Sequence, residues 1–396
     1  MKSLLILGAG ILQVAVIKKA KEKGIYTVVA DGNPAAIGLP LADKSLVVNI
    51  VDPEAVLKAL GNEHIDGVIH PCSEVAMNTM GIVNDVFHLS GIGVKTAILA
   101  TNKEKMREAF RLGNAPSPLS FGAGTFDEFL QKLYRIEGKA IVKPSRNSGS
   151  RGVSCINRQQ DRAFLEKAFD TAFMNSRDKA VVVEQYIEGP EFSVEIIIWN
   201  NEINVLTVTD KLTTGAPHFV ELGHSQPSKF SPVEVELVVK AAISGCKALH
   251  LTNCVAHAEV KLQQGKPYIM EIGARLGGDF ISTELVHLST GIDMVGAAIQ
   301  VALGEEPDLT PKHAPQGVAI RYFTPRPGVL KSIDFSKCHI DSSVYQLEVY
   351  KKTGDIISEV TSSLDRSGHV ITIGKNVEDA VAYADNIISS IGYVMQ

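Results

Sequence analysis

Two apolar segments joined by a short polar turn, between Ala258 and Gly278, constrain this chain more than any other feature. The sequence AEVKLQQGKPYIMEIGARLGG predicts a β-hairpin with the turn at QQGK. Each strand carries one glutamate, Glu259 or Glu271, at a spacing that can bring both carboxylates onto one face of a sheet. Two carboxylates without a nearby cysteine pair make a hard oxygen site, suited to Mg²⁺ holding nucleotide phosphates. Arg275, just after the second strand, could stabilise a phosphoryl group during its transfer.

The composition is that of an ordinary globular protein and argues against several classes of function. The chain has 396 residues, of which 45% are hydrophobic and 21% charged, so we expect more than one subdomain. A net charge of −5 gives no reason to expect nucleic acid or an anionic membrane as a partner. We find no convincing signal peptide, and no apolar run approaches the roughly 18 residues that span a bilayer. Five cysteines without a CxxC pair predict free thiols in a reducing cytoplasm.

The N-terminal third alternates apolar strands with helices. A helix at 13–23 flanked by two apolar strands predicts a parallel, Rossmann-like sheet. The sequence GAGILQ followed by Asp31 is also compatible with dinucleotide binding, although Gln13 stands where the third glycine would be. We favour the interpretation in which the glycines only turn the chain. A carboxylate substrate lying against residues 8–13 is a third interpretation.

Three polar segments that follow predicted strands each allow a functional and an ordinary interpretation. PCSE, residues 71–74, either lines a substrate cleft or is a plain loop in which Ser73 caps a helix. Lys143 ends the strand KAIVKP and is either solvated or, if it faces inward, paired with an anion such as a triphosphate. The loop SRNSGSRGV, residues 145–153, is not a P-loop, but it could cover phosphates with backbone N–H groups or form a polar hairpin.

The middle of the chain combines a capped helix with a segment suited to a nucleotide base. The helix in TNKEKMREAF is predicted to begin after Thr101 or Asn102 as its cap. Residues 180–198 run apolar into Glu184, turn at a Gly-Pro pair and then alternate in part like a half-buried strand. The backbone there could meet an adenine edge, and Glu191 could accept hydrogen bonds from ribose hydroxyls. The alternative is that both glutamates are solvated charges at a sheet edge.

Taken in chain order, these elements resemble the ATP-grasp superfamily over roughly residues 1–305. The shared pieces are GAGILQ with Asp31, NKEKM, VKP with its Ser/Gly loop, EQYIEGPEFSVE and the E…EIGAR hairpin. The resemblance implies an α/β protein with the ATP-grasp fold, an N-terminal Rossmann-like pre-ATP-grasp domain and a C-terminal β-rich subdomain. The implied ranges are 1–100 for the Rossmann-like domain, 101–183 for the small lobe with its phosphate lid, 184–305 for the large lobe with the Mg/ATP site, and 306–396 for the C-terminal subdomain.

The resemblance also implies a role for each matching residue, with ATP and Mg²⁺, or Mn²⁺ in its place, as cofactors. ATP would be bound by Lys103, Lys143, Ser148, Gly149, Ser150, Gly152, Glu184, Gln185, Tyr186, Ile187 and Glu191. Glu259 and Glu271 would hold the metal, and Arg275 would stabilise an acyl phosphate and its tetrahedral adduct. Many relatives carry an asparagine as third metal ligand where this chain has Gly273. One ligand must therefore come from elsewhere, be a water, or be absent.

Two further segments resemble the ligases that join amino acids into dipeptides. FVELGHSQPSKF, residues 219–230, resembles their substrate loop, and ARLGGDFIS resembles the same branch. This likeness implies that His224 acts near the reacting carboxylate or amine, where a neutral imidazole can orient or deprotonate a nucleophile. The ordinary alternative for His224 is a hydrogen bonder in a loop. GAGILQ and Asp31 also resemble purine-pathway and carbamoyl-phosphate enzymes, which leaves the branch open.

The remaining histidines and the C-terminal residues are less informative. His257 lies two residues before Glu259, on the same face of the strand, and could either tune the metal site or pack in the core. After a proline-rich connection we expect a β-rich tail, with strands near GVAIRYF, GVLKSI and VYQLEVYKK and a last helix that closes the chain. Arg321 and Arg326 either reach the substrate from this tail or keep its surface soluble.

These observations lead us to expect an ATP- and Mg²⁺-dependent carboxylate–amine ligase. It would activate a small acid, such as an amino acid, as an acyl phosphate for attack by an amine, with release of ADP and phosphate. Its partners would be small-molecule carboxylate and amine substrates, and we expect a homodimer. The rival hypotheses are a purine-pathway-like ligase such as a relative of phosphoribosylglycinamide synthetase, a non-catalytic ATP-binding regulator and, last, an NAD-dependent oxidoreductase.

Overall fold

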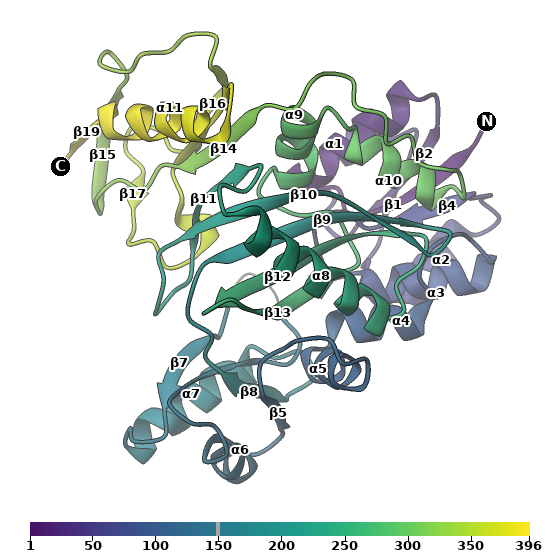
Figure 1. Cartoon of the computed structure of the whole chain (residues 1–396). Helices are drawn as coiled ribbons and strands as arrows, with labels where there is room; N and C mark the ends of the chain where they lie inside the picture. The colour runs from purple at the N-terminus through teal and green to yellow at the C-terminus, as the bar shows by residue number, and fades with distance from the viewer. Residues whose placement is uncertain (148–150) are drawn as a thin grey trace.

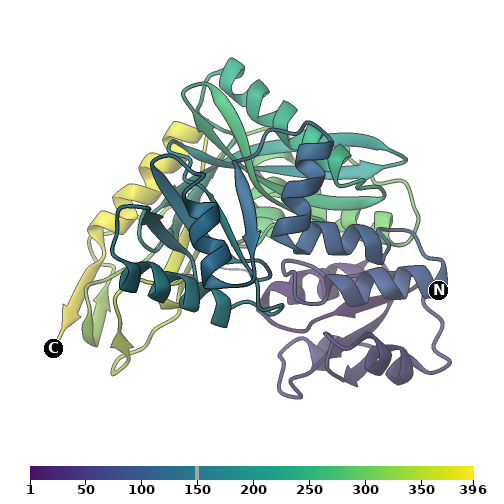
Figure 2. The same ribbon diagram turned by 90° about the horizontal axis from the view of Figure 1, so that it is seen from below.

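The computed structural model describes residues 1–147 and 151–396 of the chain. Within these residues a large central sheet is surrounded by an N-terminal part, a small lobe and a C-terminal part (Figure 1). Seen from below, the small lobe lies in front, between the C-terminal part on the left and the N-terminal part at the lower right (Figure 2). Among the described residues, no single helix has the length and apolar character needed to cross a membrane, although two helices joined at a bend of 119° reach that length together.

The N-terminal part is a parallel sheet flanked by helices, as the alternation of strands and helices predicts. Its strands follow the order β3-β2-β1-β4, and every pairing is parallel. The strands are β1 Ser3–Leu7, β2 Tyr26–Asp31, β3 Lys44–Val47 and β4 Gly67–Ile69. The helices are α1 Ile11–Glu22, α2 Pro53–Leu60, α3 Met77–Phe87 and α4 Val94–Thr101, with a 3₁₀ turn η1 at Leu39–Leu41. The backbone N–H of Ala9 donates to the Asp31 carboxylate at 2.7 Å, so the acid stabilises the glycine turn itself.

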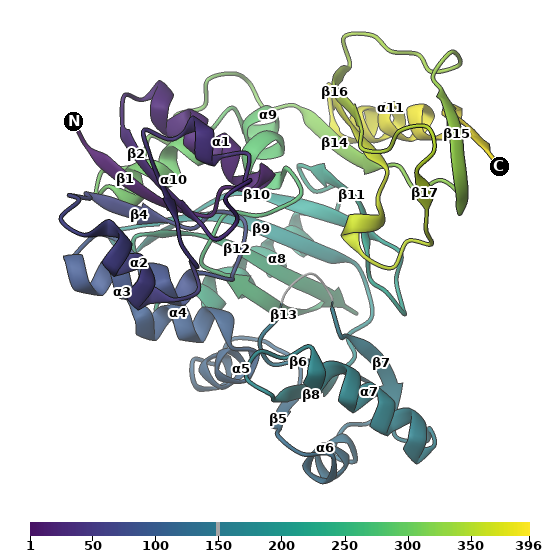
Figure 3. The same ribbon diagram turned by 180° about the vertical axis from the view of Figure 1, so that it is seen from behind.

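The small lobe is an antiparallel sheet covered on one face by helices around a cluster of phenylalanines (Figure 3). Its strands follow the order β5-β8-β6-β7. They are β5 Ser120–Ala123, β6 Lys139–Pro144, β7 Ser154–Asn157 and β8 Val181–Gln185; the helices are α5 Lys103–Leu112, α6 Phe126–Leu133 and α7 Arg162–Met174. Asn102 caps α5, as predicted, because its side chain accepts a hydrogen bond from the Lys105 N–H at 3.0 Å.

Eight strands form the central sheet, in the order β13-β12-β9-β10-β11-β14-β18-β16. They are β9 Glu191–Trp199, β10 Glu202–Thr213, β11 Glu221–Gln226, β12 Cys254–Gln263, β13 Lys266–Gly273, β14 Gly317–Tyr322, β16 Val344–Val349 and β18 Gly368–Gly374. The associated helices are α8 Pro232–Ala248, the π-helical turn η2 Ile281–Leu285, α9 Val286–Thr290 and α10 Met294–Ala302. All pairings in this sheet are antiparallel.

Strand β9 is buried on both faces, so its predicted half-buried alternation is wrong. Val194 and Ile196 pack in the core that contains α8, whereas Ile197 packs with α10 and the N-terminal part. Because helices cover both faces of the sheet at this point, every residue from Phe192 to Ile198 is buried.

The C-terminal residues are β-rich, as predicted, but three of their strands extend the central sheet, because β14 pairs with β11. The remaining strands form a sheet in the order β17-β15-β19. They are β15 Gly328–Asp334, β17 Ile356–Ile357 and β19 Gly392–Met395, accompanied by the 3₁₀ turn η3 Ser363–Asp365 and helix α11 Val377–Ser390. The expectation that a helix closes the chain is wrong, because β19 follows α11 and pairs with β15. The four domain ranges remain a prediction.

Candidate active site

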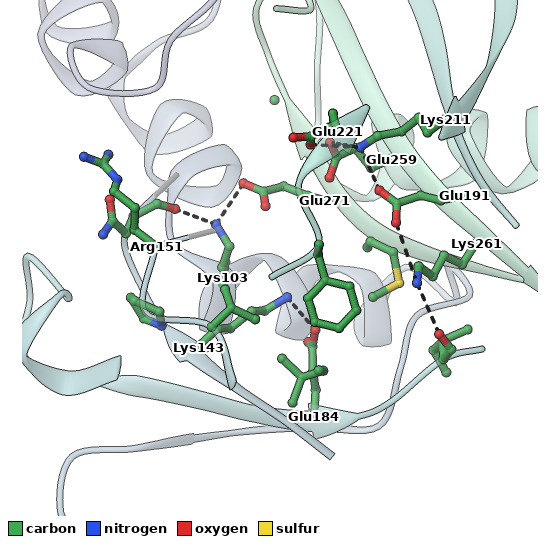
Figure 4. Close-up of a pocket in the computed structure, with 18 of the residues that line it drawn as sticks. Lys103, Lys143, Arg151, Glu184, Glu191, Lys211, Glu221, Glu259, Lys261 and Glu271 are labelled. Carbon is green, nitrogen blue, oxygen red and sulfur yellow. Dashed lines mark hydrogen bonds and ion pairs between the residues drawn. The ribbon is translucent and has the colours of Figure 1, made fainter. Parts of the chain in front are cut away.

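A cavity lies where the small lobe faces strands β9 to β13 of the central sheet (Figure 4). Acidic and basic side chains are interleaved in its lining. The charged residues are Glu74, Glu184, Glu191, Glu221, Glu259 and Glu271, with Lys103, Lys143, Lys211, Lys261, Arg151 and Arg275. Such a density of opposite charges in a concave site is typical of a site for a charged ligand.

The predicted hairpin is present, and its two glutamates face each other. In the register of β12 and β13, Glu259 lies directly opposite Glu271, and the register shifts between Glu259 and Val260. Both side chains point into the cavity and keep part of their surface exposed, 28% for Glu259 and 19% for Glu271. These two carboxylates could therefore hold a metal ion, a role that remains a prediction.

Lys103 approaches the cavity from the first turn of α5. Its ammonium donates to the Glu271 carboxylate at 2.9 Å and to the backbone carbonyl of Asn147 at 3.0 Å. Burial lowers the pKa of Lys103, but Glu271 and Glu74 outweigh burial and raise the pKa above its ordinary value. Lys103 is therefore charged and stands beside one of the two candidate metal ligands.

Lys143 faces inward, and its anion in the structure is a glutamate. Its ammonium pairs with Glu184, which also accepts from Arg107 at 3.0 and 3.1 Å. Burial lowers the pKa of Lys143 below its ordinary value despite this partner. The Glu184 carboxylate is thus held by two cations in the lobe. In the segment 184–187, the predicted contact with adenine would therefore be made by the residues that follow Glu184.

Lys211 on β10 is a cavity residue that the sequence analysis missed. Its ammonium lies 2.7 Å from Glu191, 2.8 Å from Glu259 and 3.7 Å from Glu221, and only 4% of the side chain is exposed (Figure 4). Burial lowers the pKa of Lys211, but the three carboxylates raise it well above the ordinary value. A lysine in a strand that alternates apolar and polar residues is a weak signal, and the partners of Lys211 come from three other strands.

The opposite end of the cavity is less polar and lies at the connection between the two lobes. The ring of Tyr186 lies 6.3 Å from that of Phe219, and the Lys261 ammonium lies 5.7 Å from the centre of the Tyr186 ring. The Ile187 carbonyl accepts from Lys261 at 3.4 Å. The N–H groups of Gln185 and Tyr186 donate to carbonyls within the small lobe. An aromatic and aliphatic surface of this kind suits a flat base.

Arg275 lines the cavity beside Glu74 from the N-terminal part. The two side chains form an ion pair at 3.2 Å, and the buried Nε of Arg275 has no hydrogen-bond partner among the described residues. Burial and the neighbouring Glu271 raise the pKa of Glu74 to about 7. Of the two interpretations of PCSE, the geometry favours the one in which it lines a cleft. A side chain at Gly273 would approach Arg275 to 3.1 Å, so glycine leaves room for that arginine.

His224 does not lie in a loop. The expectation of a loop over 219–230 is wrong for the stretch Glu221–Gln226, which forms β11 because β10 and β14 pair with it on either side. The His224 Nε2 faces the Asp279 carboxylate at 3.4 Å, and its Nδ1 is buried without a hydrogen-bond partner. His224 lies opposite Lys211 in the register. Its predicted catalytic role is untested.

His257 is buried beside Glu259 and is oriented by a second carboxylate. Its Nδ1 lies 2.6 Å from Glu195, and its Nε2 lies 3.8 Å from Glu259. Burial lowers the pKa of His257, but Glu195 raises it, and the result is about 9. Glu195 also accepts from Ser282 at 3.2 Å. The structure therefore combines both interpretations, a packed core histidine that also faces a candidate metal ligand.

Four predicted ATP-binding residues belong to the polar loop after Lys143. Ser148, Gly149 and Ser150 lie outside the described residues. Gly152 has a φ angle of +76° and lies beside Pro144. Its neighbour Arg151 lines the cavity.

The comparison with known proteins agrees with this geometry. Residues 136–284 match the ATP-grasp domain family, and residues 321–396 match L-amino acid ligase C-terminal domain 2. Phosphoribosylglycinamide synthetase from Anaerococcus prevotii has a similar structure, with a TM-score of 0.79, 25% identity and complete coverage of both chains. L-amino acid ligase from Bacillus licheniformis gives a TM-score of 0.84 at 21% identity, covering 100% of this chain and 99% of the ligase.

Two curated relatives from Bacillus subtilis (strain 168) match about half of their own length. Formate-dependent phosphoribosylglycinamide formyltransferase is 29% identical over 230 residues, which are 57% of this chain and 56% of the relative. Alanine–anticapsin ligase is 28% identical over 245 residues, which are 56% of this chain and 51% of the relative.

The matched domains and these relatives indicate the class of proteins to which the chain is related. Residues 136–284 form an ATP-grasp domain, and the chain is related to ATP-dependent carboxylate–amine ligases. It carries an L-amino acid ligase C-terminal domain at residues 321–396 and is related both to L-amino acid ligases and to purine-pathway ligases.

Proposed function

We propose that this protein joins the carboxylate of one amino acid to the amine of another, in a reaction driven by ATP. The observation that carries this proposal is the L-amino acid ligase domain at residues 321–396, which packs beside the cavity. Ser363 of that domain donates to Glu221, a residue of the cavity lining, at 3.2 Å. A domain of the dipeptide-forming branch thus lies at the side of the cavity where a second substrate would enter.

The phosphate chain of ATP would lie along the basic side of the cavity. Lys103 and Lys143 present buried ammonium groups from the small lobe, and Arg275 presents a guanidinium from the central sheet. Each is now paired with a carboxylate of the protein, so a phosphate group would exchange one anionic partner for another. The base would lie against Tyr186 and Ile187, with Glu191 placed to accept from the ribose.

The donor set fits magnesium bound through both protein and nucleotide oxygens. No cluster of three or more His, Cys, Asp or Glu side chains in the described ranges could hold a metal by itself. Mg²⁺ is commonly bound through one or two carboxylates, with waters and substrate phosphates completing the octahedron. Glu259 and Glu271 would supply those carboxylates, and the bound ion would neutralise charge on the phosphate oxygens.

The reaction proceeds in two balanced steps. A carboxylate oxygen of the first substrate attacks the γ-phosphorus, so a C–O–P linkage forms and ADP leaves. The amine nitrogen of the second substrate then attacks the acyl carbon, the C–O bond to phosphate breaks, and the amine proton passes to a base. Arg275 would offset the charge that develops on the acyl phosphate and the tetrahedral adduct. His224 is the candidate for orienting the amine or taking its proton.

A second candidate function is ligation of a purine-pathway carboxylate. It is favoured by one observation, the 25% identity to phosphoribosylglycinamide synthetase over the whole of both chains. That synthetase and the L-amino acid ligase share the fold, so the substrate end of the cavity must discriminate between the two functions.

The test is ADP release with Mg-ATP against amino acids, singly and in pairs, beside the Glu271→Ala variant. Release that requires a pair and is lost in the variant supports the proposal. Release with phosphoribosylamine and glycine instead supports the purine-pathway candidate. ATP binding without release in any mixture would contradict both and support a non-catalytic nucleotide-binding protein.

A further inference from the structure

The residues that follow Arg275 adopt an unusual backbone conformation. Asp279 and Phe280 have positive φ angles of 51° and 62°, and the π-helical turn η2 begins immediately afterwards. A left-handed conformation is uncommon for aspartate and is an outlier for a bulky residue such as phenylalanine. Such a conformation persists where the surrounding structure holds it in place, and it is concentrated at functional sites.

The C-terminal part of the chain holds this segment. Arg366 donates two hydrogen bonds to the Asp279 carboxylate, at 2.7 and 2.8 Å. The Tyr322 hydroxyl donates to the Asp279 carbonyl at 3.3 Å, and the Phe280 ring stacks on His369 with centroids 4.5 Å apart. The Arg366 guanidinium also lies 3.7 Å from the centre of the Tyr322 ring. A two-pronged guanidinium contact fixes both the distance and the direction of the carboxylate.

The Arg366–Asp279 pair is shielded from solvent. The Arg366 side chain is 9% exposed and that of Asp279 is 25% exposed. Burial raises the pKa of Asp279, but the hydrogen bonds from Arg366 outweigh it and hold that pKa well below its usual range. The carboxylate therefore stays ionised, and the contact stays complete, across the pH range in which a ligase would work.

The same segment contacts the groups proposed to act on the substrate. The Asp279 carboxylate lies 3.4 Å from Nε2 of His224. Arg275, four residues earlier, lines the cavity. Between them, the Gly277 N–H donates to Ser282 at 2.7 Å, so the chain is anchored there too. Asp279 therefore contacts His224 directly and is joined to Arg275 through the short stretch of chain between them.

We propose that Arg366 is a positioning residue for the ligation reaction. It fixes Asp279 and, through the segment 277–280, directs Arg275 and His224 toward the reacting carboxylate. The inference rests on the proposed function and assigns to the C-terminal part a role in catalysis, although Arg366 lies 87 residues from Asp279 in the sequence.

Steady-state kinetics of three variants test the proposal. Arg366→Met removes the contact, Arg366→Lys keeps the charge without the fork, and Asp279→Asn weakens the acceptor. We expect kcat/KM for the carboxylate substrate to fall about 100-fold in Arg366→Met and about tenfold in Arg366→Lys, because small misplacements of reacting groups are costly. The KM for ATP should change by less than about threefold, because Arg275 is one of three cations along the phosphates, and Lys103, Lys143 and the base contacts lie outside the 277–280 segment. The double variant Arg366→Met/Asp279→Asn should be no worse than Arg366→Met, as expected for residues acting as one unit.

Asp341→Asn is the matched control. It breaks the exposed ion pair of Asp341 with His339, at 3.0 Å, in the same C-terminal part without touching the 277–280 segment. Its kinetic constants should equal those of the unmodified protein. Equal losses in Asp341→Asn and Arg366→Met would show that the effect is general destabilisation and would overturn the proposal.

Hydrogen–deuterium exchange of the full chain gives a readout that needs no substrate. We expect faster exchange over residues 276–285 in Arg366→Met and in Arg366→Lys, with no change over 139–143 or 185–191. Unchanged exchange over 276–285, or an unchanged kcat/KM in Arg366→Lys, would overturn the positioning role. Absence of amino-acid-dependent ADP release from the unmodified protein would instead overturn the proposed function, so the two failures are distinguishable.

Discussion

The cavity and the junction with the C-terminal part both contain partly buried charges, but they pair them with different cations. In the cavity, single ammonium groups make most of the contacts, as Lys103 does with Glu271 and Lys211 does with Glu259, and Arg275 adds a single contact with Glu74. At the junction, Arg366 grips one carboxylate with two parallel hydrogen bonds and stacks on an aromatic ring.

This difference separates charged groups that can exchange their partners from charged groups that fix the positions of neighbouring residues. An ammonium is a point charge on a flexible stem, so it can leave a protein carboxylate for a phosphate at little geometric cost. A guanidinium fork on a buried carboxylate has a single arrangement that satisfies all its donors. We infer that the ammonium groups of the cavity pair with protein carboxylates until an anionic ligand replaces those carboxylates. The Arg366–Asp279 pair, in contrast, stays formed and fixes the protein structure.

The strongest test of this difference is a change of Glu271, which belongs to the cavity groups that can exchange partners. Glu271→Gln should lower the rate of substrate-dependent ADP release about 1,000-fold, because a neutral amide lacks the negative charge that attracts a metal ion and pairs with the Lys103 ammonium. Glu305→Gln is the control, since Glu305 forms only an exposed pair with Lys2. Equal rates in the two variants would contradict the assignment of Glu271 to the site.

The buried triad in the small lobe should respond through stability. Glu184→Gln leaves Lys143 and Arg107 buried with no counter-charge from that residue, so we expect a loss of about 3 kcal/mol in the free energy of unfolding. Lys143→Met should cost less, because Glu184 keeps Arg107. Urea unfolding measures both. An equal loss in the two variants would show that Glu184 does not stabilise Arg107 and Lys143 together.

A substitution of Lys211 tests directly whether a cavity lysine occupies carboxylates that would otherwise bind a cation. With nucleotide absent, Lys211→Met should bind Mn²⁺ about tenfold more tightly, because the ammonium no longer competes for Glu259 and Glu191. Calorimetry or electron paramagnetic resonance of bound Mn²⁺ would measure this. Lys240→Met, at an exposed pair on α8, is the control. Unchanged or weaker Mn²⁺ binding by Lys211→Met would show that Lys211, like Arg366, fixes the protein structure and does not compete with a cation.

The smallest expected effect is a pH dependence at the junction. Burial and the nearby Arg366 lower the pKa of His369 to about 4, below the value of about 6.5 in an unfolded chain. Between pH 6.5 and pH 4, His369 is therefore protonated in the unfolded state and neutral in the folded state. The contribution of His369 to the free energy of unfolding is complete above pH 6.5 and is lost as pH falls from there toward 4.

Several charged or titratable groups face His369. The Tyr350 hydroxyl lies 2.6 Å from its Nδ1, Glu348 lies opposite it in the sheet, and Arg366, Asp279 and Tyr322 lie nearby.

Urea unfolding at pH 7.5 and pH 5.5 measures the loss of stability at His369. Between these values the unmodified protein should lose about 1 kcal/mol more than His369→Gln. His339→Gln, with an exposed histidine, should keep the full slope. Identical slopes for the unmodified protein and His369→Gln would show that folding does not lower the pKa of His369.

Much of the fold was predictable because its signals are local. The parallel N-terminal sheet follows from strands alternating with helices, the start of α5 follows from its Asn102 cap, and the 258–278 hairpin follows from its turn. The burial of β9 on both faces and the strand β11 were missed. Each depends on helices or strands that pack from distant parts of the chain, which no local pattern reports.

For the candidate site, the sequence by itself showed the resemblance to the ATP-grasp superfamily and the facing glutamates Glu259 and Glu271, and it singled out Lys143 while leaving open whether that lysine faces inward. A hairpin register depends on its own turn, and a charge at the end of an apolar strand is visible without neighbours. Only the tertiary structure decided which partners these charges take. Lys211 reaches carboxylates from β9, β12 and the start of β11, and Arg366 reaches Asp279 across 87 residues. Such pairs depend on the order of strands in the sheet and on how domains dock, because a side chain contacts whatever lies beside it in space rather than what lies near it in sequence.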